Sequence, residues 1–212
     1  MRKTILVLTP LYGILLFLLL YVVATFYYPG GSQADKSTKG FDWLNNYWCD
    51  LTDQLAMNGE TNSARPIALT AILLLLSTLA VFWYYLPRIF QNSKYSQIIR
   101  YAGITSMTVS IFVFTRLHVI ALNIAGIFGI IALIGTFIEL YKNKLPYLFG
   151  YGLFCLGVIV LNYIVFDTGW LYSFLPLLQK VAFILFLLWI CMMDIYLYRI
   201  TKTAGKGELN AR

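Results

Sequence analysis

The chain has 212 residues, of which 60% are hydrophobic and 12% are charged, and its net charge is +7. About a quarter of the residues of a soluble domain are charged, so an ordinary water-soluble fold is excluded. Six bilayer crossings of about 20 residues each take about 120 residues, which leaves room for loops and tails but for no large extramembrane domain.

Six apolar segments are long enough to cross a bilayer. The first, residues 4–28, carries no charge and is longer than the core of a signal peptide, so it is interpreted as a retained span. The others cover residues 66–86, 98–115, 117–138, 145–166 and 176–198. The sequence therefore predicts an all-α polytopic membrane protein: a single six-transmembrane-helix bundle over residues 1–200, followed by a cytoplasmic tail over 201–212.

The basic residues are divided unequally between the two sides of this threading. Eleven of the 16 lie on one side, and the other side holds Lys36, Lys39, Arg65, Arg116 and Lys180. By the positive-inside rule the richer side, with both termini, is cytoplasmic, and we expect the bacterial inner membrane as the location. Because the basic residues are spread through short loops and a tail, membrane lipid is the expected partner and no nucleic-acid partner is expected.

The one long loop, residues 29–65, is predicted to lie outside. Apolar residues at 41, 44, 48, 51 and 55 recur at helical spacing, which predicts a short amphipathic helix in this first outer loop. Asp50 and Asp53 are three residues apart and would share one face of that helix. Such a pair can bind a cation, hold a raised pKa, or belong to a structural cap whose carboxylates face water.

The other outer polar residues are Arg116, His118, Asp167 and Lys180. Lys180 either extends toward the headgroups or pairs with an outer acid. Together with Asp50 and Asp53 these residues form the predicted ligand-binding site, suited to a lipid headgroup, with Asp50, Asp53 and His118 as the candidates for catalysis. A single histidine excludes bis-His haem and a His-rich zinc site, and we assign no metal ligands and no cofactor.

Small residues recur on the fourth segment at Ala121, Ala125 and Gly129, which predicts close helix packing. Glu139 and Lys142 are predicted to form an i,i+3 pair at the membrane boundary. The three cysteines lie in different segments, so no disulfide is indicated.

Several of these features resemble a family of mostly prokaryotic six-span membrane proteins of unknown function, related to the Frag/DRAM/Sfk group. The resemblance rests on the outer Phe41–Leu51 segment, on His118 with Ala121 behind it, and on Gln179-Lys180 with Trp189 further along. It implies a six-helix bundle with Asp50 and His118 at one outer site. Relatives in the wider group are linked to lipid handling, so the resemblance implies a membrane function but no particular reaction.

The leading hypothesis is an integral membrane protein whose outward-facing polar site binds or senses lipid or supports a membrane-protein partner. The alternatives are a small intramembrane enzyme acting on a lipid or headgroup, and a structural subunit of a membrane complex. A transporter is disfavoured because no charged residue lies near the middle of any predicted span and no paired broken helices are indicated.

Overall fold

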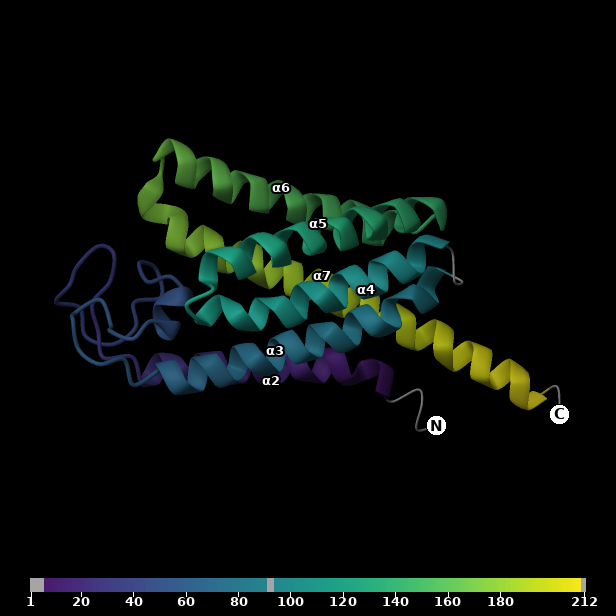
Figure 1. Cartoon of the computed structure of the whole chain (residues 1–212), viewed down its shortest axis with the longest axis horizontal. Helices are drawn as coiled ribbons and strands as arrows, with labels where there is room; N and C mark the ends of the chain where they lie inside the picture. The colour runs from purple at the N-terminus through teal and green to yellow at the C-terminus, as the bar shows by residue number, and fades with distance from the viewer. Residues whose placement is uncertain (1–5, 91–93, 211–212) are drawn as a thin grey trace. The chain divides into compact units, whose positions relative to one another are not determined.

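A computed structural model of the chain describes residues 6–90 and 94–210. Within these ranges the secondary structure is helical, apart from two isolated β-bridges. Six helical segments are long and apolar enough to cross a membrane, and Figure 1 shows them in chain order by colour. The predicted all-α class with six membrane-spanning helices is confirmed, and these helices fit an integral membrane protein.

The long helices begin and end close to the predicted limits. They are α2 (Thr9–Phe26), α3 (Arg65–Tyr85), α4 (Lys94–Ser110), α5 (His118–Lys142), α6 (Pro146–Thr168) and α7 (Leu175–Asn210). Short 3₁₀ helices accompany them: η1 (Leu6–Leu8), η2 (Cys49–Thr52), η3 (Leu86–Phe90), η4 (Ile111–Phe114) and η5 (Tyr172–Phe174). The largest difference is at the end of the chain, where α7 continues to Asn210 through most of the predicted tail. Residues 4 and 5 of the first predicted span, and 211 and 212 of the tail, lie outside the described residues.

The chain divides into two compact units. Unit 1 comprises Met1–Ile14, Leu73–Tyr151 and Trp189–Arg212, and it holds the α4–α5 hairpin. Unit 2 comprises Leu15–Ile72 and Gly152–Leu188, and it holds the long α2–α3 loop, residues 27–64. The single membrane domain expected over residues 1–200 stays a prediction.

In unit 1, the small residues of α5 lie where α4 packs against it, and Figure 1 shows these two helices side by side. Ala121 and Ala125 are buried, and the hydroxyl of Ser106 donates a hydrogen bond to the carbonyl of Ala125 at 2.8 Å. A side chain at Gly135 would meet Ile99 of α4. The predicted packing role of this stripe is therefore confirmed, since the absence of larger side chains lets the backbones approach closely.

A second anchor of unit 1 is the Trp189 ring, which is 1% exposed. Its indole Nε1–H donates to the carbonyl of Leu148 at 2.8 Å, and the ring stacks on Phe137 with centroids 5.4 Å apart and an interplanar angle of 17°. A hydrogen bond and a ring stack thus join segments of α5, α6 and α7.

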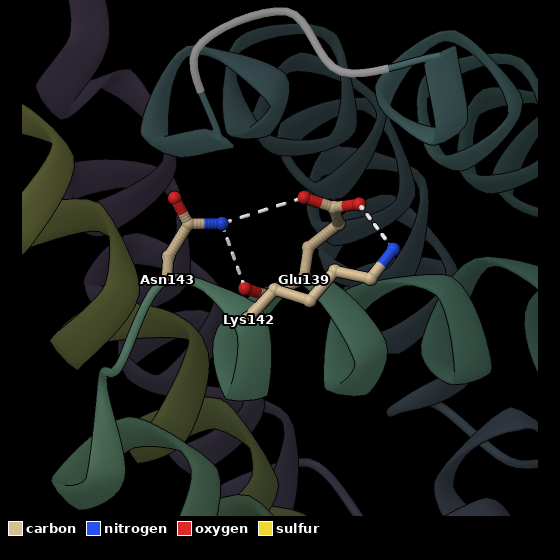
Figure 2. Close-up of polar contacts among 3 residues, drawn as sticks. All are labelled: Glu139, Lys142 and Asn143. Atoms are coloured by element: carbon tan, nitrogen blue, oxygen red, sulfur yellow. Dashed lines mark hydrogen bonds and ion pairs between the residues drawn. The ribbon is translucent and has the colours of Figure 1, made fainter.

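The turn from α5 to α6 is built on Glu139, whose side chain is buried (Figure 2). Lys142 Nζ lies 3.8 Å from Glu139 Oε1, which confirms the predicted pair. Asn143 Nδ2 donates to the backbone carbonyl of Glu139 at 2.8 Å and so closes the last turn of α5. Lys144 follows with a left-handed φ of 53°, and Pro146 begins α6 at a position where its missing N–H costs nothing.

The faces of α5 that lack protein neighbours are apolar. Ile120, Ile127, Ile130 and Ile134 are each more than half exposed. Such a face on a helix long enough to cross a bilayer is suited to contact with acyl chains, which explains why its exposure is compatible with a stable protein.

Candidate functional site

The predicted amphipathic helix in the α2–α3 loop is reduced to the four residues of η2. Before it, Asp42 Oδ1 accepts the backbone N–H groups of Leu44 and Asn45 at 2.9 and 3.2 Å. Asp side chains that bond nearby backbone groups compete with helical hydrogen bonds, so this segment forms turns although its apolar residues have helical spacing. The expectation of a helix over 41–55 is thus too long.

Gly31 enables the loop to fold back on itself. Its φ is +80°, and a side chain there would collide with the backbone of Met57 and Asn58. The N–H of Met57 donates to the hydroxyl of Tyr28 at 3.0 Å, and the N–H of Asn58 donates to the carbonyl of Gly30 at 3.1 Å. Two distant parts of the loop therefore lie side by side.

Asn46 is the centre of the loop, and it is fully buried. Its Nδ2 group donates to the carbonyl of Gly31 and to Asp50 Oδ2, both at 2.9 Å. Its Oδ1 atom accepts the N–H of Asp42 at 2.9 Å. One side chain thus makes three hydrogen bonds to three different turns, which indicates a structural role.

Asp50 is 4% exposed and serves the same network. Its Oδ2 atom also accepts the N–H of Tyr47 at 2.9 Å, while Asn62 Nδ2 donates to the backbone carbonyls of Asp50 and Asp53 at 2.9 and 3.0 Å. Burial raises the pKa of the Asp50 carboxyl above its usual range, although the hydrogen bonds from Asn46 and Tyr47 lower it. The carboxylate predicted to bind ligand or catalyse is largely used to hold the loop.

The helix α7 brings Gln179 and Lys180 to this loop. Lys180 is 5% exposed, and its Nζ group donates to the carbonyls of Asn46 and Pro176. Gln179 Oε1 accepts the N–H of Trp48 at 3.2 Å. Neither expectation for Lys180 describes this arrangement fully, because its ammonium group neither reaches water nor forms an ion pair within 4 Å in the described residues, but donates to backbone carbonyls near Asp50.

Below these polar groups lies an aromatic cluster. The Trp48 ring contacts Tyr21, Phe183 and Phe17 edge to face, with centroid distances of 5.3, 5.3 and 6.4 Å. Its backbone carbonyl accepts the hydroxyl of Tyr21 at 3.3 Å. The α2–α3 loop is therefore fastened to α2 and α7 by both apolar and polar contacts.

Asp53 does not share a helical face with Asp50. It follows η2 with an extended backbone (φ −70°, ψ 155°), and its side chain is exposed. Burial raises the pKa of its carboxyl, and the charge of Arg65 lowers it. The predicted acidic pair is therefore one buried carboxyl and one exposed carboxyl.

The remaining predicted site residues lie elsewhere. Asp167 is exposed near the end of α6 and makes no hydrogen bond or ion pair with the described residues. Arg116 and His118 belong to unit 1, in the turn between η4 and α5, and both are exposed. His118 Nδ1 is 2.6 Å from the carbonyl of Val113 and must donate, since a carbonyl only accepts. The structure thus joins Asp50 to Lys180 in unit 2, and Arg116 to His118 in unit 1.

A groove that the sequence did not reveal lies between α4 and α5 in unit 1. It is open to one side and has a volume of about 340 Å³. Its lining consists of Ser106, Ser110 and Val113 from the first half of the hairpin, and of Leu122, Ala125, Gly126, Gly129, Ile130 and Leu133 from α5. The only sequence signal for it was the run of small residues on α5, which indicates close packing as readily as a hollow.

Asp50 makes the stability of the α2–α3 loop depend on pH. Because its pKa is higher in the folded chain than in the unfolded chain, the stability it contributes is present below the ordinary value of about 3.9 and is lost as pH rises through the raised value. We therefore expect wild-type stability to fall over this range relative to Asp50→Asn, measured by denaturant unfolding at successive pH values.

The control for this measurement is Asp35→Asn. Hydrogen bonds from Ser37 lower the pKa of Asp35, so its contribution is instead lost as pH falls, and its removal must change the profile with the opposite sign. Parallel profiles for the wild type and Asp50→Asn would contradict the assignment.

Among the described residues, no group of three or more His, Cys, Asp or Glu side chains is arranged to hold a metal ion. No family model matches the chain, and no similar curated protein or solved structure was found. The candidate function therefore depends on the geometry of the two units.

Proposed function

We propose that this chain is an integral membrane protein that binds a bilayer lipid in the α4–α5 groove. The observation that carries the proposal is an open, mostly apolar groove on helices that are long and apolar enough to cross a membrane. Its volume of about 340 Å³ is at the lower end of the range for ligand sites.

The chemistry of the lining favours an acyl chain over a polar ligand. The two hydroxyl groups in the groove donate their protons within the protein, from Ser106 to the carbonyl of Ala125 and from Ser110 to the carbonyl of Ser106, both at 2.8 Å. Leu122 and Ile130 are more than half exposed beside them. An acyl chain fills such a site without leaving a polar group unpaired, whereas a polar ligand would lose hydrogen bonds to water.

The orientation that we propose follows the distribution of basic residues. Both termini face the cytoplasm, the α2–α3 loop and Arg116 lie on the opposite side, and the membrane is the bacterial inner membrane. The open groove then faces the bilayer interior.

An enzyme acting on a lipid has less support. Asp50 is buried and bonded to Asn46 and Tyr47, so its carboxylate is not presented to a substrate. A structural subunit of a membrane complex would instead seat a partner helix in the groove, and the same experiment separates that alternative.

The test is the lipid retained by the purified protein in mild detergent, measured by native mass spectrometry and by phosphorus analysis. Gly126 lines the groove, and a side chain there meets nothing within 4 Å, so Gly126→Leu fills the hollow without disturbing the fold. We expect the wild type to retain phospholipid and Gly126→Leu to lose it.

The matched control is Gly157→Leu on α6. It makes the same change at another helical glycine that has open space around it and does not line the groove. Equal lipid retention by Gly126→Leu and the wild type would overturn the proposal, as would a wild-type protein that carries no lipid. A co-purifying protein that only Gly126→Leu releases would favour the subunit alternative.

A further inference from the structure

The end of the α4–α5 groove nearest the η4–α5 turn carries a positive charge. Val113 lines the groove at this end, and Arg116 follows it by three residues in the turn. The hydrogen bond between His118 Nδ1 and the carbonyl of Val113 fixes the turn, because it ties η4 to the first residue of α5. An exposed guanidinium group therefore lies next to the mouth of an apolar groove.

We infer that the bound lipid is an anionic phospholipid, with an acyl chain in the α4–α5 groove and its phosphate at Arg116. This inference rests on the proposed lipid-binding function and adds the chemical class of the lipid. A guanidinium group matches the phosphate geometry with two parallel hydrogen bonds, which an ammonium group does not offer.

The charge of Arg116 has no partner within the described residues. It forms no ion pair there, and the sequence contains no Asp or Glu between Glu60 and Glu139, a stretch that includes α3, α4 and most of α5. Topology does not require this charge either, because Arg116 lies on the side that is poor in basic residues. A ligand that supplies negative charge accounts for it.

The length of the groove agrees with one leaflet. Its α5 lining extends from Leu122 to Leu133, which at a rise of about 1.5 Å per residue is about 16 Å. Half of a hydrocarbon core of about 30 Å is about 15 Å. A lipid whose headgroup is level with Arg116 therefore places its acyl chain along the whole groove. The beginning of α5, where helical N–H groups lack partners, adds to the positive potential at the same level.

The test uses the purified full-length chain in nanodiscs that contain phosphatidylglycerol and phosphatidylcholine with identical acyl chains. Native mass spectrometry then measures which lipid remains bound as the disc lipid is stripped. We expect the wild type to prefer phosphatidylglycerol about fivefold, the effect of one basic group near an anionic headgroup. Arg116→Gln should lose this preference and still retain lipid, and Arg116→Lys should recover part of it.

The control for charge alone is Lys39→Gln, which removes an exposed basic residue of the α2–α3 loop. It should keep the wild-type preference. A preference that survives in Arg116→Gln, or that is lost equally in Lys39→Gln, would overturn the inference and leave lipid binding intact. If the wild type holds no more of either lipid than Gly126→Leu does, the proposed function itself fails.

Discussion

Asn46→Ala is expected to destabilise the α2–α3 loop by about 3 kcal/mol or more. The substitution removes three buried hydrogen bonds at once and leaves the N–H of Asp42, the carbonyl of Gly31 and the Asp50 carboxylate short of partners. An unsatisfied buried group costs about 1–3 kcal/mol, and a charged group costs more. Unfolding in mixed micelles measures the change, and faster hydrogen exchange at the amides of Asp42 and Tyr47 localises it to the loop.

The matched control is Asn45→Ala. Asn45 is only partly buried, and its side chain donates a single hydrogen bond, to Asp42 Oδ2 at 2.8 Å. Its loss should cost about 1 kcal/mol or less, since water replaces the missing partner. Equal effects of the two substitutions would contradict the central role given to Asn46.

Trp189→Ala is expected to destabilise unit 1 by about 3–5 kcal/mol, the usual cost of replacing a buried Trp by Ala. The ring is 1% exposed, so its removal leaves a cavity beside Phe137, and the carbonyl of Leu148 loses its indole donor. Inside a bilayer, where burial from water does not drive helix association, this loss of packing weighs directly on stability. Thermal unfolding of the purified protein in detergent measures the effect.

Two further substitutions separate the causes. Trp189→Phe keeps an aromatic ring and removes the indole donor, so a loss of about 1 kcal/mol is expected. Trp170→Ala changes a ring that is 67% exposed and should have little effect. If Trp189→Ala is no more harmful than Trp170→Ala, the ring does not anchor unit 1.

The six helices could be read from the sequence because hydrophobic length is a local property. Each apolar run of about 20 residues satisfies its own backbone hydrogen bonds as a helix, whatever its neighbours do. The same argument correctly assigned Ala121 and Ala125 to helix packing and Glu139 to a pair with Lys142. Periodicity was misleading in the α2–α3 loop, where the side chain of Asp42 takes backbone donors that a helix would need.

The candidate site was less accessible to sequence reasoning. Asn46 and Lys180 are 134 residues apart, and their contact depends on how α7 returns to the loop, which no local pattern specifies. The six outer polar residues share a side of the predicted threading, but a shared side does not make a shared site. The structure joins Asp50 with Lys180 and, separately, Arg116 with His118 through the turn at Val113.

Composition by itself determined that this protein spans a membrane, because 12% charged residues cannot cover the surface of a chain that is 60% hydrophobic. The scarcity of charge also limited the candidate residues to a small set. Only the tertiary structure decided their uses, since the same carboxylate can bind a ligand or hold a loop, and the choice depends on which groups surround it. Burial commits Asp50 to the loop, while exposure beside a groove leaves Arg116 available to a lipid.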